Sequence, residues 1–191
     1  MQEQREFAAA EQWYRKSLDI EEKLDDEYGV ASTYHQLGII AQQQQDFASA
    51  EQWYRKSLAI KEKLGNEYGA AITYHQLGRV AQEKRDLAAA EQWYRKSLAI
   101  KEKLGDEHGA AITYGQLGIV EAARTNFPES ARWSIKCILA FLRTNDTHSA
   151  HHGAQNFMIF YGEAPASDKA KMKAMWEEAG LSEIPPKSPP G

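Results

Sequence analysis

The chain has 191 residues, of which 42% are hydrophobic and 26% charged, so it can bury a core and still stay in solution. Its formal net charge of −4 argues against a nucleic-acid-binding surface, because such a surface needs a basic excess to displace counterions. No segment approaches the ~18–20 consecutive apolar residues of a membrane span, and the start MQEQREF does not resemble a signal peptide.

One cysteine, Cys137, excludes an internal disulfide framework. It lies in the apolar run SIKCILAFL, which favours an inert buried thiol over a nucleophile. Together these features predict a protein of the reduced cytoplasm.

An eight-residue block recurs along the chain. EQWYRKSL occurs at 11–18, 51–58 and 91–98, and a diverged copy, ARWSIKCI, follows at 131–138. The spacing is 40 residues each time, and 51–65 is identical to 91–105. A fixed period in this range is typical of a stacked repeat array.

Each 40-residue unit contains two segments with apolar residues spaced by three or four, which indicates two helices. The first stripe is Phe47, Ala50, Tyr54, Leu58 and Ile60, and the second is Ala70, Tyr74, Leu77, Gly78 and Ala81. Leu64-Gly65-Asn66 predicts a helix end with a left-handed residue, and Asp46 and Asp86 are candidate N-caps. No strand-like alternation competes, which excludes a propeller blade of similar period.

The pattern Tyr34, Leu37, Gly38, Ala41, followed by Ala50, Tyr54, Ser57 and Leu58, resembles the tetratricopeptide repeat. It recurs from Tyr74 and, more weakly, from Tyr114. The resemblance implies an all-α fold, a right-handed α-solenoid in which each repeat packs a helix A against a helix B. The 40-residue unit is similar to the longer subclass found in kinesin light chains and in bacterial arrays. HEAT repeats share the period, but their helix proline is absent here.

In this register the chain opens on a helix B alone, at 7–24. Complete pairs are predicted at 30–64, 70–104 and 110–143, so that the array fills residues 1–146. Residues 147–180 are interpreted as a degenerate capping pair with Met172, Met175 and Trp176 on its apolar side, and 181–191 as a proline-rich tail. The missing first helix A leads us to expect a fragment of a longer array.

Candidate chemistry is sparse. His148, His151 and His152 invite a zinc site, but no CxxC or HExxH motif accompanies them. We therefore predict no metal and no cofactor. No nucleophile motif or phosphate loop occurs, and the chain is not expected to be an enzyme. The Trp-Tyr pairs of the repeated block are interpreted as packing between repeats.

The resemblance implies that the A helices line a concave groove, and it assigns candidate ligand-binding residues there. They are Ser32, His35, Gln36, Ile39, Gln42 and Gln43 in the first full repeat, Ile72, His75, Gln76, Arg79, Gln82 and Glu83 in the second, Ile112, Gly115, Gln116, Ile119, Ala122 and Ala123 in the third, and His152, Gln155, Asn156 and Ile159 in the last. Arg79 is the only obvious cation, so a clamp for a terminal carboxylate is not expected.

An amide recurs every 40 residues in this set, at Gln36, Gln76, Gln116 and Asn156. A side-chain amide offers both a donor and an acceptor, which suits the backbone of an extended peptide. The alternative is that these amides bond only within the array or to water.

Two functions follow. The first is a protein- or peptide-binding scaffold, as part of a larger signalling or regulatory protein. The second is a self-associating module that pairs with a copy of itself through the exposed face of helix 7–24, forming a homo-oligomer. Neither needs nucleic acid or a membrane.

Overall fold

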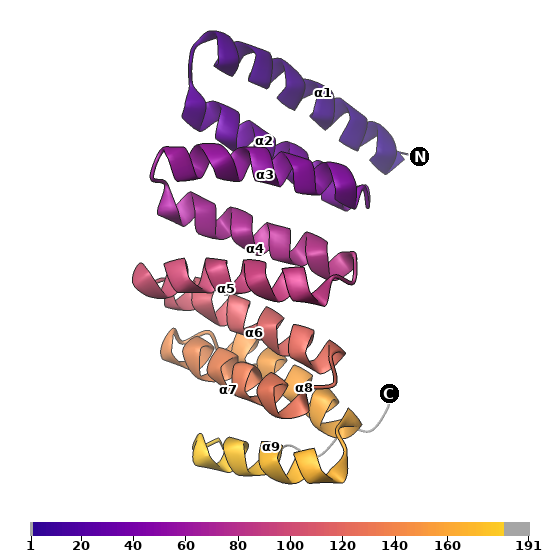
Figure 1. Ribbon diagram of the computed structural model, residues 1–191, viewed down its shortest axis with the longest axis vertical. Coiled ribbons are helices and arrows are strands. Elements are labelled where there is room, and N and C mark those ends of the chain that lie inside the picture. The colour runs from indigo at the N-terminus through magenta and orange to yellow at the C-terminus, as the bar shows by residue number, and fades with distance from the viewer. Residues whose placement is uncertain (1, 182–191) are drawn as a thin grey trace. The chain divides into compact units, whose positions relative to one another are not determined.

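The computed structural model describes residues 2–181, with side chains from Phe7 onward, and in this range the chain forms α-helices and no strand (Figure 1). The helices are α1 (Gln2–Lys23), α2 (Glu27–Gln43), α3 (Phe47–Lys63), α4 (Glu67–Glu83), α5 (Leu87–Lys103), α6 (Glu107–Ala123), α7 (Phe127–Arg143), α8 (Thr147–Glu163) and α9 (Ala166–Glu178). They form an all-α solenoid with two compact units, Met1–Ile100 and Lys101–Gly191. The last turn of α5 belongs to the second unit.

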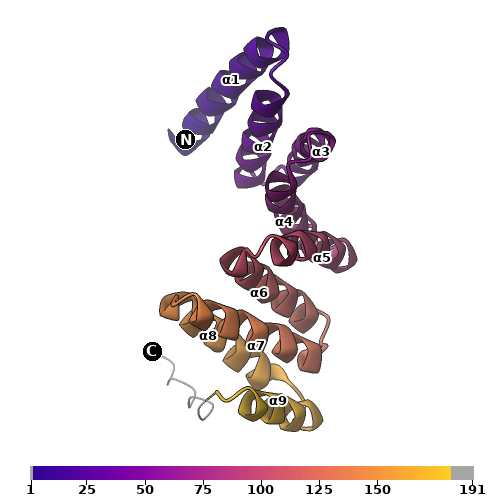
Figure 2. The ribbon, with the colours of Figure 1, turned by 90° about the vertical axis from the view of Figure 1, so that its left-hand side faces the viewer.

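In the first unit each helix packs against the next in the chain, as the contacts of α1 with α2, α2 with α3, and α3 with α4 show (Figure 2). Its core contains a cluster that includes Tyr54 and Leu58 of α3 and Leu77 of α4. Tyr54 is completely buried, and Leu77 is 1% exposed. The repeated block therefore supplies the largest core side chain of this unit.

In the second unit α7 is the central helix, because it contacts α6, α8 and α9. Its cluster includes Phe157 of α8 with Met172 and Trp176 of α9. The rings of Phe157 and Trp176 lie 4.5 Å apart between centroids. Met172 and Trp176, which the sequence places on the apolar side of the last helix, are both buried.

A left-handed residue follows each of the helices α1 to α7, at an interval of 20 residues. The positions are Asp25, Gln45, Gly65, Arg85, Gly105, Thr125 and Asn145, with φ between 52° and 69°. The following residue caps the next helix: Asp46 accepts from the Ser49 amide at 3.0 Å, and Asp86 from the Ala89 amide at 3.0 Å. The left-handed Gly65 and both aspartate caps confirm the turn chemistry expected from the sequence.

The A helices begin earlier than predicted. Helix α2 starts at Glu27 rather than at residue 30, and α4 and α6 show the same difference. The N-cap explains the difference. The Asp26 side chain accepts a hydrogen bond from the Gly29 amide, so Glu27, Tyr28 and Gly29 form the first turn of α2. Helix α1 likewise begins at Gln2, not at residue 7. Of the predicted tail, residues 182–191 lie outside the described range.

Buried serines join the two helices of a pair. Ser57 Oγ donates to the carbonyl oxygen of Ala31 at 2.6 Å, and Ser97 Oγ donates to that of Ala71 at 2.7 Å. Both serines are completely buried, so each bond satisfies a hydroxyl that would otherwise cost free energy. The serine of EQWYRKSL is therefore a packing residue. No helix of the described chain is both long enough and apolar enough to cross a bilayer.

Candidate functional site

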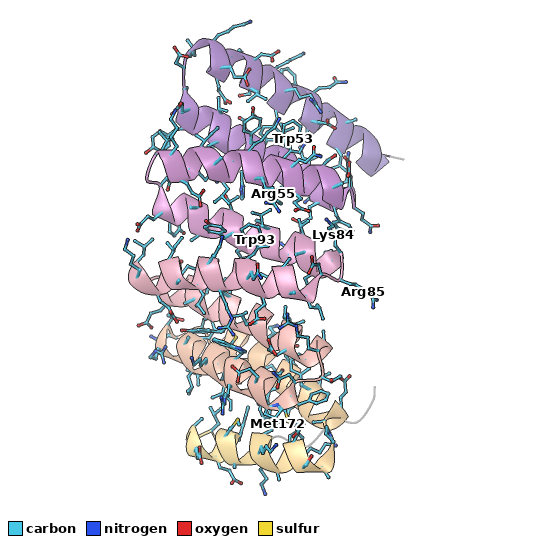
Figure 3. The ribbon with its side chains drawn as sticks, in the orientation of Figure 1. Trp53, Arg55, Lys84, Arg85, Trp93 and Met172 are labelled. Atoms are coloured by element: carbon cyan, nitrogen blue, oxygen red, sulfur yellow. The ribbon has the colours of Figure 1, made fainter. Side chains whose placement is uncertain are left out.

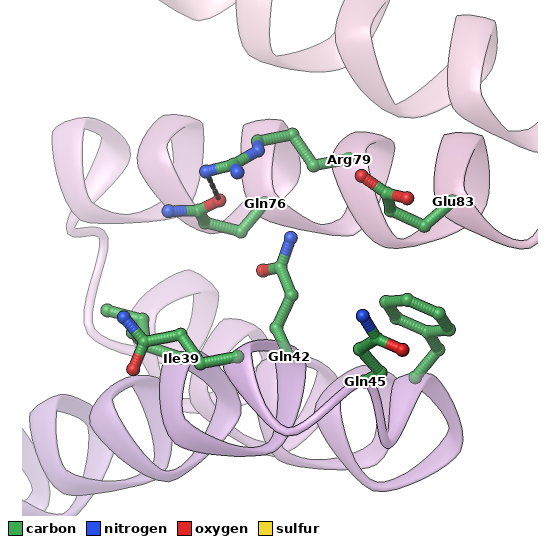
Figure 4. A pocket seen from close by; sticks show the side chains of 8 residues that line it. Ile39, Gln42, Gln45, Gln76, Arg79 and Glu83 are labelled. Atoms are coloured by element: carbon green, nitrogen blue, oxygen red, sulfur yellow. Dashed lines mark hydrogen bonds between the residues drawn. The ribbon is translucent and has the colours of Figure 1, made fainter. Parts of the chain in front are cut away.

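A pocket of about 290 Å³ lies in the first unit between α2 and α4 (Figure 4). Its lining residues come from the end of α2, the turn after it, the start of α3, and α4: they are Ile39, Gln42, Gln43, Gln45, Phe47, Gln76, Arg79 and Glu83. The structure thus brings together half of the candidate residues of the first two repeats, namely Ile39, Gln42, Gln43, Gln76, Arg79 and Glu83. Gln45 and Phe47 were not predicted, because they belong to the turn and to helix B.

The amides of this pocket are not equivalent. Gln42 Oε1 accepts a hydrogen bond from the Tyr54 hydroxyl at 3.0 Å, so its oxygen is already held by the core. Gln76 Oε1 accepts a bond of 3.4 Å from Arg79 Nη1, and Figure 4 shows the two side chains side by side on α4. Gln36 is exposed on α2 and is not part of the lining. Gln76 is therefore the amide of the first unit that faces the pocket beside a cation.

Arg79 gives the pocket its positive charge, and Glu83, one turn further along α4, gives it a negative one. Both side chains are exposed at the pocket. A guanidinium and a carboxylate beside amides can bind charged and polar groups of a peptide, with the planar guanidinium suited to carboxylates.

The two histidines are packing residues of the first unit. The His35 ring lies 5.2 Å from the Tyr54 ring, and the His75 ring lies 5.2 Å from the Tyr94 ring. His35 Nδ1 is also 3.3 Å from Thr73 Oγ1, which accepts from Lys61 Nζ at 2.9 Å. Neither histidine lines the pocket.

Burial and the nearby Lys61 charge lower the pKa of His35 from 6.5 to about 4. Burial also lowers the pKa of Lys61, to about 8. His35 is consequently neutral at pH 7, and its interactions are those of a buried hydrogen-bonding ring rather than of a cationic ligand-binding group.

The second unit contains its own pocket, of about 210 Å³. Its lining includes six candidates of the sequence analysis, Ile112, Gly115, Gln116, Ile119, His152 and Asn156, together with Ser134, Cys137, Phe141, Ser149 and Gly153. Two of the recurring amides, Gln116 of α6 and Asn156 of α8, therefore meet at one pocket. Ile159 is 56% exposed and is not part of this lining.

Reasoning from the sequence missed the contribution of α7 to this pocket, namely Ser134, Cys137 and Phe141. A signal was available, because Ser134 occupies the repeat position at which Tyr54 and Tyr94 stand. Cys137 is a buried free thiol, and burial raises its pKa to about 11, which agrees with the expectation of an inert side chain.

The B helices carry a row of stacked aromatic and cationic side chains (Figure 3). Trp53 stacks on Tyr34 with centroids 5.5 Å apart, and Lys56 Nζ lies 4.6 Å from the Trp53 centroid. Trp93 likewise stacks on Tyr74, and Lys96 Nζ lies 4.8 Å from the Trp93 centroid. The Arg55 Cζ atom lies 5.3 Å from the same centroid. These tryptophans are covered within their own array, as predicted, and so offer less surface to a ligand.

Trp13 departs from this row. It is 69% exposed, and Lys16 Nζ lies over its ring, 4.9 Å from the centroid. On the same helix, Ile20 is 58% exposed. Among the side chains that the structure describes, no aromatic ring stacks on Trp13, so the packing role predicted for the Trp-Tyr pairs is not seen at this residue.

The histidines at the start of α8 form local pairs. His148 and His152 approach to 3.1 Å between their Nε2 atoms, and His151 Nε2 lies 3.0 Å from Gln155 Nε2. In the described residues, no three His, Cys, Asp or Glu side chains come close enough together to hold a metal ion.

The tetratricopeptide repeat family model matches residues 1–63 and 69–138. Among solved structures, the crystal structure of BtubC (BKLC) from P. vanneervenii is similar, with a TM-score of 0.78 and 20% sequence identity. The match covers 99% of this chain and 81% of that one. At this identity the likeness shows the fold alone. No curated protein matches the chain.

Proposed function

The chain belongs to the tetratricopeptide repeat family, and from that membership we propose that it is a non-enzymatic scaffold whose A helices hold an extended segment of a partner protein. Repeats of this family are generally protein–protein interaction scaffolds. We further propose that it acts as a docking arm of a larger signalling or regulatory protein. The buried free thiol of Cys137 fits the reduced cytoplasm that we propose as its location.

One observation carries this proposal: three of the four recurring amides line a pocket, one in the first unit and two in the second. Gln76 lines the pocket of the first unit, and Gln116 and Asn156 line that of the second. A peptide backbone presents alternating donors and acceptors, which a side-chain amide matches. The exposed Arg79 and Glu83 add charged groups that would select among side chains of the bound segment.

The experiment is a selection of random linear peptides on the immobilised chain, followed by affinity measurement of the selected peptides in solution. A double variant, Gln76→Ala with Arg79→Ala, should lower the affinity for peptides that bind the first unit at least tenfold. It removes the recurring amide and the cation of that pocket. The matched control replaces an exposed glutamine and an exposed arginine of the B helices, Gln92→Ala with Arg132→Ala.

If the parent chain selects no peptide, the scaffold proposal is wrong. If the control variant loses binding as much as the double variant does, the peptide binds elsewhere than the A helices. Circular dichroism confirms that both variants retain the helical content of the parent.

A second function is favoured by the surface of α1. Trp13 is 69% exposed and Ile20 58%, whereas Trp53 and Ile60, at the same positions of the next repeat, are half-buried. A helix B with its apolar side open favours association, and we propose a homodimer through α1 as the alternative. Light scattering coupled to size exclusion tests it: a dimer that Trp13→Lys with Ile20→Lys converts to a monomer supports this alternative, and a monomeric parent chain excludes it.

A further inference from the structure

The two units fill the space between their helices differently. In the first unit, two rings fill it: the Tyr54 ring, completely buried, lies against Gly38 and 5.2 Å from the His35 ring. Tyr94 repeats this arrangement with Gly78 and His75. A pair of aromatic rings is therefore what the repeat normally places at this position.

In the second unit both rings are missing. Ser134 stands at the position of Tyr54 and Tyr94, and Gly115 at the position of His35 and His75. Gly118, the counterpart of Gly38, now has the small Ser134 side chain as its neighbour. Both substituted residues line the cavity of about 210 Å³ between α6, α7 and α8. The cavity is thus the space that the two rings of the other repeats would occupy.

The lining of this cavity carries no aspartate, glutamate, lysine or arginine. Its walls include Ile112, Ile119 and Phe141, and the lining residue Cys137 is 4% exposed. A charged side chain placed here would lose hydration without gaining an aspartate, glutamate, lysine or arginine as its ionic partner, which is unfavourable. An uncharged apolar group gains by burial instead.

The size of the cavity fits one side chain. A dry protein cavity of about 150 Å³ is large enough for benzene, and clefts for drug-sized ligands measure about 300–1,000 Å³. At about 210 Å³, the cavity lies between these values and matches a single aromatic ring with a short attachment.

We propose that this cavity receives one uncharged aromatic side chain from the extended segment of a protein partner. The incoming ring replaces the ring that the diverged repeat has lost. Gln116 and Asn156, which line the same cavity from α6 and α8, lie where they can bond the backbone on either side of that residue. The inference rests on the proposed scaffold function and adds the chemical class of the residue that anchors the partner.

The first test uses a probe that does not depend on any peptide. The ring of a tyrosine side chain is represented by p-cresol, which is titrated into the isotope-labelled chain while backbone amide signals are followed by NMR. We expect saturable shifts at Gly115 and Gly153, which line the cavity. Butylammonium, the matched charged probe, should leave these amides unshifted.

The variant that fills the cavity is Ser134→Phe. Phenylalanine is preferred to tyrosine because a tyrosine hydroxyl would lack its acceptor here. The hydroxyls of Tyr54 and Tyr94 donate to Gln42 and Gln82, respectively. Ala122 occupies the corresponding position in this repeat. The control, Ser167→Phe, adds the same ring at an exposed residue of α9 outside the cavity.

The proposal predicts that Ser134→Phe raises the dissociation constant of p-cresol at least tenfold and that Ser167→Phe leaves it unchanged. It is overturned if p-cresol shifts no cavity amide of the parent chain, or if binding persists in Ser134→Phe.

Peptides selected on the parent chain distinguish this inference from the scaffold proposal. Peptides that carry an aromatic residue and lose affinity in Ser134→Phe support both. Peptides that bind equally to the parent and to Ser134→Phe overturn the anchor and leave the scaffold intact. Selection of no peptide at all overturns both.

Discussion

The ring of Tyr54 lies so close to Gly38 that a Cβ at residue 38 would stand 2.6 Å from the Tyr54 Cε1 atom. Tyr94 and Gly78 have the same relationship, also at 2.6 Å. A glycine inside a helix costs about 1 kcal/mol relative to alanine, so close packing is the physical reason for its presence. The finding explains the Leu-Gly pairs of α2 and α4 by a specific contact with a tyrosine of the following B helix.

Gly78→Ala should therefore lower the stability of the chain. The substitution gains about 1 kcal/mol in helix propensity. Overpacking costs about 1–3 kcal/mol and outweighs this gain, because the buried Tyr94 ring has no room to move away from the added Cβ. Urea unfolding followed by circular dichroism measures the effect as a lower midpoint. Gly118→Ala is the matched control, because its nearest neighbour is the Ser134 hydroxyl oxygen at 3.0 Å. It should change stability by less than about 0.5 kcal/mol.

Thr125→Gly should raise stability. Thr125 closes α6 with φ at 60°, a conformation that costs an L-amino acid about 1–2 kcal/mol and is worst for β-branched side chains. Gly65 and Gly105 occupy the same position in their turns without this cost. We expect a gain of about 1 kcal/mol in the free energy of unfolding. Thr125→Ala, which keeps a Cβ, should give no comparable gain, and an equal gain would refute the explanation.

Stability should fall as the pH decreases from about 6.5 to about 4, because of His35. Its pKa is about 4 in the folded chain and 6.5 in the unfolded one, so the unfolded chain binds more protons in this window. The neutral histidine contributes its full stability above pH 6.5, and that contribution is lost progressively down to pH 4. The effect is a few kcal/mol at most.

The control for this pH dependence is His35→Gln, which retains hydrogen-bonding capacity but does not titrate. Unfolding midpoints measured between pH 4 and 7 should depend less steeply on pH in this variant than in the parent. Equal slopes in the two proteins would show that His35 is not responsible.

Ser134→Phe should stabilise the second unit as well as block its cavity. Burying a phenylalanine side chain contributes about 1.5–3 kcal/mol relative to leaving it exposed, and the cavity already provides the space. We expect a net gain of about 1–2 kcal/mol after the loss of side-chain entropy. Thermal unfolding measures it, with Ser167→Phe as the exposed control. A lower melting temperature for Ser134→Phe would mean that the cavity does not admit a ring.

The fold was predictable from the sequence because the array repeats its own core. Tyr54, Leu58 and Leu77 stand at helical spacing, and Tyr94, Leu98 and Leu117 repeat them 40 residues later. A 40-residue period with such stripes leaves few alternatives. The helix starts were less predictable. Because Asp26 is the N-cap, α2 begins at Glu27, three residues before the predicted start at Val30. The tyrosine and glycine between these two residues do not indicate a helix in the sequence.

The candidate site was predictable only in part. Gln76 and Arg79 line the same pocket, and this follows from their spacing of three residues on one helix and from the family resemblance. The packing role of His35 depends on Thr73 and Lys61, which lie 38 and 26 residues further along the chain, and a single sequence does not reveal such a network. The cavity at Ser134 arises because Ser134 and Gly115 replace the tyrosine and histidine of the other repeats. Inspection of a sequence for charged, aromatic or metal-binding residues does not reveal a site that consists of absent side chains.

The central claim is that the A helices hold an extended peptide, and one titration tests it most directly. The isotope-labelled chain is titrated with its tightest selected peptide, and the side-chain amide signals of glutamine and asparagine are followed by NMR. The account predicts that the signals of Gln76, Gln116 or Asn156 shift and saturate with the peptide, while that of Gln92 on helix B does not move. Shifts confined to Gln92 and its neighbours on the B helices would contradict it.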